Sequence, residues 1–90
     1  MGALITFKLF ASLSEYLPRE LDGHAAVGHE IAVDIDDATA VEDVIERFKL
    51  PRHQVHLVLV NGRYVPPALR PTHLLRAGDA LAIWPPIAGG

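Results

Sequence analysis

The chain has 90 residues, a formal net charge of −3 and no cysteine. That length supports one domain with a modest core, and a composition that is 50% hydrophobic and 21% charged is typical of a globular chain. The acidic balance argues against nucleic acid as a partner, since binding to phosphates needs a basic face. Without cysteine, disulfides, thiolate catalysis and cysteine-ligated metals are excluded. No apolar run approaches the ~18 residues of a membrane span, so we expect no membrane partner.

The first third of the chain contains two stretches with the periodicity of strands. Leu4–Phe10 and Glu30–Asp36 each alternate apolar and polar side chains, as half-buried strands do. Between them we expect a short helix over Ser12–Leu17, closed by Pro18, and an exposed loop over Gly23–Gly28. These elements predict a long hairpin with a partly helical connection.

The strongest local signal is that of a helix. Thr39 and Glu42 have the spacing of a capping box, in which the Thr side chain accepts from the Glu42 amide and the Glu side chain reaches back. An apolar stripe at helical spacing follows, and Pro51 ends the helix. Burying the stripe, at ~1.5–3 kcal/mol per large side chain, should outweigh a cap worth ~1 kcal/mol. The stripe consists of Val41, Val44, Ile45 and Phe48.

Two strands joined by a tight turn are predicted next. Val55–Val60 is apolar on both faces apart from His56, which favours a central strand. Asn61-Gly62 suits a type I′ turn. The returning strand over Arg63–Val65 is short and is cut off by Pro66-Pro67, as is typical of an edge.

A further turn at Ala77-Gly78-Asp79 leads to the last predicted strand, Leu81–Trp84. The order of elements predicts an α+β domain with a mixed four- to five-stranded sheet and one main helix packed across it. This is the β-grasp, or ubiquitin-like, arrangement, with the first and last strands parallel in the middle of the sheet. We therefore expect a β-grasp domain over residues 1–84 and a flexible Gly-Gly tail over residues 85–90.

The tail reads Pro85-Pro86-Ile87-Ala88-Gly89-Gly90. Extended, its six residues reach about 20 Å, and the two prolines stiffen its base. Gly90 has no side chain to crowd its carbonyl, and Gly89 allows backbone conformations that other residues disfavour. The pattern predicts a terminal carboxylate that a partner's active site can reach and modify; a frayed end is the alternative.

On these features the chain resembles the sulfur-carrier proteins of the MoaD/ThiS family. The resemblance covers nearly the whole chain, and its most specific part is the tail, which is more similar to the molybdopterin synthase carriers than to the thiamin carriers. Ser14 stands where the family often has Arg, and the connection over Pro18–Gly28 is long. The matching segments are Phe10-Ala11 with Glu15, the helix over Thr39–Phe48, Val60-Asn61-Gly62, Gly78-Asp79 and Trp84–Gly90.

The resemblance implies a protein that is not catalytic alone. An E1-like adenylating enzyme would activate the Gly90 carboxylate with ATP, and a sulfurtransferase would supply the sulfur that makes it a thiocarboxylate. A molybdopterin synthase large subunit, or an equivalent acceptor, would then take the sulfur in the cytoplasm. The chain itself would bind no cofactor. Gly89 and Gly90 are the expected reacting residues, and the expected partner-binding residues are Leu59, Trp84, Pro85, Pro86, Ile87 and Ala88.

Other uses of the same tail stay open. The sulfur could serve thiamin, a tungsten cofactor or tRNA thiolation, or the chain could be a ubiquitin-like protein modifier that is joined through Gly90 to lysines of target proteins. A plain interaction module with an inert tail is a third reading. Among the five histidines, His53 and His56 are three apart but fall across a loop and a strand start, so we expect no metal site.

Overall fold

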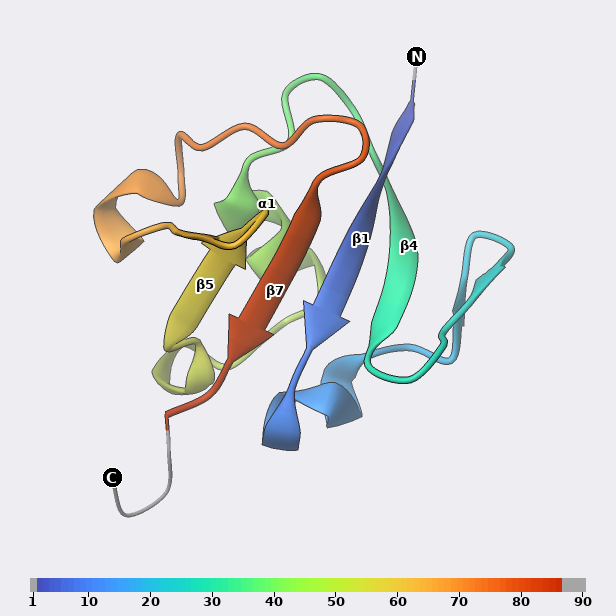
Figure 1. Ribbon diagram of the computed structural model, residues 1–90, viewed down its shortest axis with the longest axis horizontal. Helices are drawn as coiled ribbons and strands as arrows, with labels where there is room; N and C mark the ends of the chain where they lie inside the picture. The colour runs from blue at the N-terminus through green and yellow to red at the C-terminus, as the bar shows by residue number, and fades with distance from the viewer. Residues whose placement is uncertain (1, 87–90) are drawn as a thin grey trace.

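A five-stranded mixed sheet forms the centre of the molecule, and one main helix, α1, crosses one of its faces (Figure 1). The computed structural model describes residues 2–86. The strand order is β4-β1-β7-β5-β6, which confirms the predicted β-grasp arrangement. The elements are β1 (Ala3–Leu9), β4 (Glu30–Ile35), α1 (Val41–Arg47), β5 (Leu57–Val60), β6 (Arg63–Tyr64) and β7 (Ala80–Trp84).

The first and last strands are neighbours in the middle of the sheet, as predicted. β1 and β7 run parallel, with Phe7 opposite Leu81. β4 pairs antiparallel with the other side of β1, and β5 pairs antiparallel with the other side of β7. The end of β7 therefore lies between two paired strands and not at an edge of the sheet.

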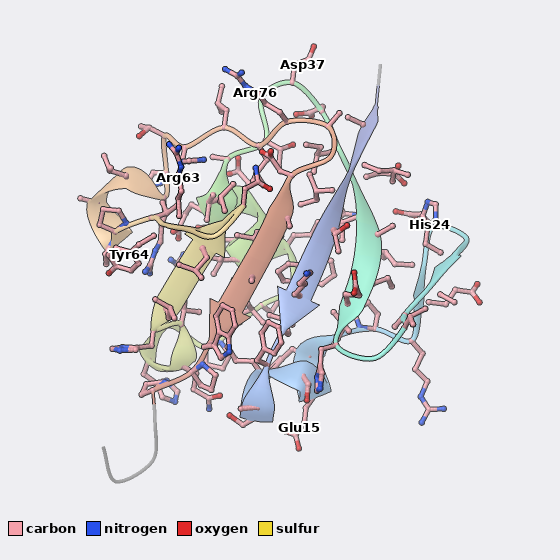
Figure 2. All side chains as sticks on the ribbon, viewed as in Figure 1. Glu15, His24, Asp37, Arg63, Tyr64 and Arg76 are labelled. Atoms are coloured by element: carbon pink, nitrogen blue, oxygen red, sulfur yellow. The ribbon has the colours of Figure 1, made fainter. Side chains whose placement is uncertain are left out.

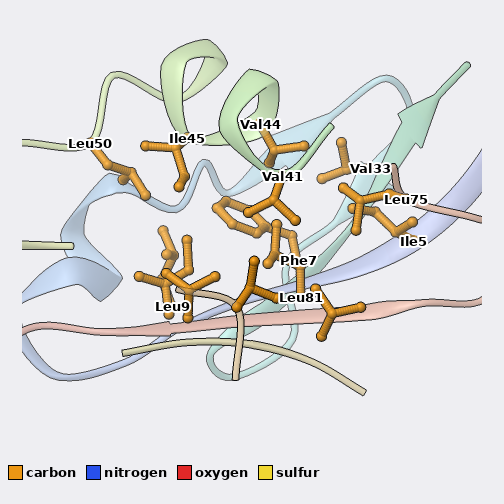
Figure 3. Close-up of a cluster of buried hydrophobic side chains, with 14 of the residues drawn as sticks. Ile5, Phe7, Leu9, Val33, Val41, Val44, Ile45, Leu50, Leu75 and Leu81 are labelled. Atoms are coloured by element: carbon orange, nitrogen blue, oxygen red, sulfur yellow. The ribbon is translucent and has the colours of Figure 1, made fainter. Parts of the chain in front are cut away.

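The core fills the space between α1 and the sheet (Figure 3). Alternate residues of each strand point toward the helix, since successive side chains of a strand lie on opposite faces. The predicted helical stripe meets them: Val41, Val44 and Ile45 are buried, and the Phe48 ring stacks on Phe7 with centroids 4.7 Å apart. The fully buried side chains of Val41, Val44 and Ile45 each contribute about 1.5–3 kcal/mol by leaving water, so the helix is held chiefly by the sheet.

The predicted capping box is wrong by one residue. The N-cap is Ala40, and the carboxylate of Asp43, not Glu42, accepts a hydrogen bond from the Ala40 amide at 2.8 Å. Thr39 instead bonds to Asp36 in the preceding turn, its hydroxyl donating to Asp36 Oδ1 at 2.9 Å. Alanine can serve as the N-cap because other backbone groups satisfy the first helical amides.

Those backbone groups come from a segment distant in sequence. The Val41 amide donates to the carbonyl of His73 at 2.9 Å, and the Glu42 amide donates to that of Arg70 at 3.0 Å. The Leu75 amide in turn donates to the Thr39 carbonyl at 2.8 Å. The irregular stretch between β6 and β7, with the short helix η3 (Pro67–Leu69), thus caps α1.

The predicted exposed loop over Gly23–Gly28 is also wrong in part. A small separate hairpin, β2 (Glu20–Leu21) and β3 (His24–Ala25), occupies its start. Asp22 and Gly23 form the turn with φ of 50° and 82°, the positive angles that a type I′ turn requires. The same geometry recurs at Asn61-Gly62, with φ of 52° and 82°, where it was predicted.

The short connections agree with the prediction more closely. The expected helix after β1 is the 3₁₀ helix η1 (Ala11–Tyr16), and a second one, η2 (Arg52–Gln54), precedes β5. The next strand begins at Leu57, two residues later than expected, and β6 is a two-residue edge strand.

Candidate functional site

The base of the predicted tail is the end of β7. Trp84 is the last residue of the strand and is half-buried, as is Pro85, whereas Pro86 is exposed. Because β7 lies between β1 and β5, the chain leaves the sheet from its middle. The other expected tail residues, Ile87, Ala88, Gly89 and Gly90, lie outside the described residues.

Trp84 is held from both sides. Its carbonyl accepts a hydrogen bond from the His56 amide at 3.1 Å. Its side chain stacks on the Phe10 ring, with centroids 4.3 Å apart and planes 2° from parallel. Phe10 is itself fixed to β7, since its amide donates to the Ile83 carbonyl at 3.2 Å. A third ring, that of His29, lies on Phe10 at 5.6 Å.

The sheet face opposite α1, which we name the outer face, is apolar over β7, β5 and β6. Leu59 lies at its centre, directly opposite Ala82 on one side and Tyr64 on the other. Leu57 is likewise opposite Trp84. Leu59 and Trp84, two of the residues expected to bind a partner, are both half-buried and share this face. The apolar residues at both parities of β5, which predicted a central strand, therefore form one core face and one partly exposed face.

Charged residues border this apolar surface. Lys8 lies in β1 between Ala82 of β7 and Glu30 of β4, and Asp34 is exposed further along β4. Arg63 lies with Tyr64 on the opposite edge of the sheet, in β6 (Figure 2). An apolar centre with a polar rim is the usual anatomy of a protein–protein interface.

Sequence reasoning missed Arg70, the one buried charged side chain that the structure places among residues 2–86, 6% exposed. Its Nε donates to the Val65 carbonyl at 3.1 Å, and its Nη2 donates to the His56 carbonyl at 3.4 Å. Burial lowers the pKa of the guanidinium. Arg70 thus ties the end of β6 to the residue whose amide holds Trp84, and no local sequence pattern signals such a role.

The remaining features lie away from Trp84, apart from the His56 amide that bonds to its carbonyl. A groove at the opposite end of the sheet is lined by polar side chains that include Asp37 and Arg76, labelled in Figure 2. Within residues 2–86, no three histidine or acidic side chains are grouped as metal ligands would be. His53 lies in η2 and His56 just before β5. None of the described helices has the length and apolarity needed to cross a bilayer.

Taken together, a mixed β-grasp sheet, an open apolar face and a strand that leads from the sheet centre into Pro85-Pro86 define a ubiquitin-like domain. The family model that matches the chain is that of the ThiS family, over residues 8–90. The chain therefore belongs to the ThiS family. No curated protein matches the sequence significantly.

Solved structures agree with this assignment. The Haloferax volcanii HVO 2177 protein is 25% identical, with a TM-score of 0.70 over 99% of this chain and 88% of that one. SAMP1 of the same organism, small archaeal modifier protein 1, is 26% identical, with a TM-score of 0.64 over 98% of this chain and 100% of that one. A Pyrococcus furiosus protein, provisionally named molybdopterin converting factor subunit 1, is 20% identical, with a TM-score of 0.60 over 94% and 99%; at that identity the match shows the fold alone.

Proposed function

We propose that this protein is a cytoplasmic sulfur carrier whose Gly90 carboxylate is adenylated and converted to a thiocarboxylate. Its sulfur then goes to the pterin precursor of molybdopterin, so that the chain acts as the small subunit of a molybdopterin synthase. The observation that carries the proposal is the match to the ThiS family through Gly89-Gly90, on a tail that starts from the centre of the sheet.

The chemistry needs a reactive end and a partner that does the catalysis. The Gly90 carboxylate attacks the α-phosphorus of ATP in an E1-like enzyme, and pyrophosphate leaves. A sulfur nucleophile from a sulfurtransferase then attacks the acyl carbon, and AMP leaves; where the sulfur arrives as a persulfide, a thiol reductant releases the thiocarboxylate. Covalent activation of this kind divides one difficult step into two easier ones. ATP is bound by the partner, and the chain provides its own acyl group.

The outer face suits docking of that enzyme. Leu59 lies on it opposite Ala82, and Trp84 lies on it next to Pro85, so a partner that covers the face would also lie at the base of the tail. An exposed apolar surface rimmed by charges is a usual mark of such an interface.

The thiocarboxylate can be tested by intact mass. Protein produced together with its adenylating enzyme and sulfurtransferase should show one oxygen replaced by sulfur, resolved from oxidation of Met1 or Trp84 by exact mass. Because the chain has no cysteine, alkylation by iodoacetamide gives a second readout for the thiocarboxylate. Variants that lack Gly89-Gly90, or carry one added residue, should show neither signal. Unmodified protein under these conditions would contradict the proposal.

The pathway needs its own test. Thiocarboxylated protein mixed with a molybdopterin synthase large subunit and the pterin precursor should yield the dithiolene product. A thiocarboxylate that forms but is not consumed by this subunit would direct the sulfur to another acceptor, such as those of thiamin, tungsten-cofactor or tRNA-thiolation pathways.

A modifier is the second candidate, because a protein named small archaeal modifier protein 1 is 26% identical over most of this chain. In that case Gly90 would be joined to lysine amines of target proteins. Mass spectrometry of the protein recovered from cells would then show isopeptide adducts at Gly90 and no thiocarboxylate.

A further inference from the structure

Phe10 stacks on the side chain of Trp84 and does not belong to the buried core cluster. It is half-buried, follows β1 and is the N-cap of η1. Its ring lies flat on Trp84, 4.3 Å between centroids and 2° between planes. Offset parallel rings attract one another beyond the area they bury. This stack joins the ends of the two central, parallel strands.

The backbone around the stack has little freedom. The Phe10 amide donates to the Ile83 carbonyl at 3.2 Å, and on the other side of β7 the His56 amide donates to the Trp84 carbonyl at 3.1 Å. Two contacts therefore meet at Trp84, the Phe10 stack and the His56 hydrogen bond, and a third fixes Ile83 just before it. Proline fixes its own φ and restricts the residue before it, so the orientation of Trp84 determines the direction in which Pro85 and Pro86 continue.

From this geometry we propose that Phe10 is a positioning residue, which acts through Trp84 to aim the tail. This inference rests on the proposed function, in which the Gly90 carboxylate is the group that is aimed and the active site of an adenylating enzyme receives it. An aimed tail raises the fraction of docked complexes in which the carboxylate lies at the ATP site, because less conformational entropy is lost when the reacting group reaches that site. A role of this kind differs from contact with the enzyme, which Leu59 on the same face would provide.

The two roles affect different kinetic constants. Loss of a docking contact weakens binding of enzyme and carrier, which raises KM with little change in kcat. Loss of aiming leaves docking intact but lowers the productive fraction of complexes, which lowers kcat. The variants that separate these outcomes are Phe10→Leu, which keeps an apolar side chain but removes the ring, Phe10→Tyr, which restores the ring, and Leu59→Ala as the docking control.

The first measurement needs no partner. Trp84 is the only tryptophan in the chain, so time-resolved fluorescence anisotropy reports on that side chain alone. In Phe10→Leu the fast component of the decay should grow, while Phe10→Tyr should resemble the wild type. Circular dichroism and urea unfolding confirm that each variant is folded. A Phe10→Leu variant that is folded and shows wild-type Trp84 mobility would overturn the inference.

The second measurement is pyrophosphate release from ATP by the cognate adenylating enzyme, as a function of carrier concentration. Phe10→Leu should lower kcat about three- to tenfold, the range set by a typical aromatic pair, with KM near the wild-type value. Phe10→Tyr should recover kcat, and Leu59→Ala should raise KM. An increase in KM alone for Phe10→Leu would make Phe10 a docking residue and overturn the inference, as would unchanged kinetics. Absence of adenylation in the wild type would instead overturn the proposed function, whatever the anisotropy shows.

Discussion

Asp36 shows how a single side chain organises the turn before α1. Its Oδ1 accepts from the Thr39 hydroxyl at 2.9 Å and from the Ala38 amide at 2.9 Å, and the Asp36 amide donates back to Thr39 Oγ1 at 3.1 Å. The hydrogen bond from Thr39, and then that from Ala38, lower the pKa of the Asp36 carboxyl below 3.8, since both donors favour the charged form. Thr39, which was predicted as the cap of α1, thus stabilises the neighbouring turn instead.

Replacing Thr39 by Val should raise the pKa of Asp36. A carboxyl whose pKa is lowered on folding stabilises the fold above its unfolded pKa, and this contribution is lost as the pH falls through the folded pKa. The stability difference between wild type and Thr39→Val should therefore be largest above pH 3.8 and narrow below it. NMR titration of the Asp36 carboxyl carbon and urea unfolding at several pH values measure both effects. Thr72→Val is the control, because the Thr72 hydroxyl donates to the Leu69 carbonyl and not to Asp36. An unchanged pKa of Asp36 in Thr39→Val would contradict the account.

At the scale of elements, α1 is short and depends on its surroundings. It spans Val41–Arg47, hardly two turns, and isolated helices of that length are unstable in water. The sheet binds its apolar stripe, and the carbonyls of Arg70 and His73 accept from its first amides. Asp43 adds the one side-chain bond at the N-terminus, to the Ala40 amide.

Asp43→Ala should destabilise the protein by about 1 kcal/mol, the typical worth of a helix cap. Urea unfolding measures the change in the free energy of unfolding. Glu46→Ala provides a matched control, since it removes an exposed carboxylate from the same helix whose ion pair with Arg52 lies at the surface and should cost less than about 0.5 kcal/mol. If the two variants were equally stable, the cap assigned to Asp43 would be refuted.

At the scale of the whole molecule, stability and function occupy different parts of the chain. The core cluster runs from Ile5 to Ile83 and closes through the parallel pairing of β1 with β7. Because that pairing joins the two ends of the chain, the sheet is complete only when the last strand is in place, a non-local contact of the kind that slows folding. Among residues 2–86, this cluster already includes the last strand of the sheet, through Leu81 and Ile83.

Deleting residues 87–90 should therefore leave the free energy of unfolding within about 0.5 kcal/mol of the wild type, the usual range for changes away from the core. The same deletion should abolish adenylation. Urea unfolding with an unchanged slope, beside a pyrophosphate-release assay, would establish the separation. A truncated protein that unfolds much more easily would show that the tail has a structural role.

Local signals in the sequence determined the order of elements, and with it the β-grasp fold. Alternation predicted β1 and β4, the Asn61-Gly62 pair predicted the turn after β5, and the apolar stripe predicted α1 and its buried face. The tail was conspicuous for the same reason: prolines and glycines act through their own backbone, so their effect can be read without knowing their neighbours.

Contacts between distant segments were decided by the tertiary structure alone. The cap of α1 comes from residues 70–75, the buried Arg70 binds carbonyls of Val65 and His56, and the Phe10–Trp84 stack joins the ends of the two central strands. Nothing near Phe10 in the sequence shows that Trp84 will lie on it, because their rings meet only after β1 and β7 pair. The sequence by itself thus indicated the main strands of the sheet and α1, because their signals are local. The pairing of strands far apart in the chain decided which residues meet at Trp84.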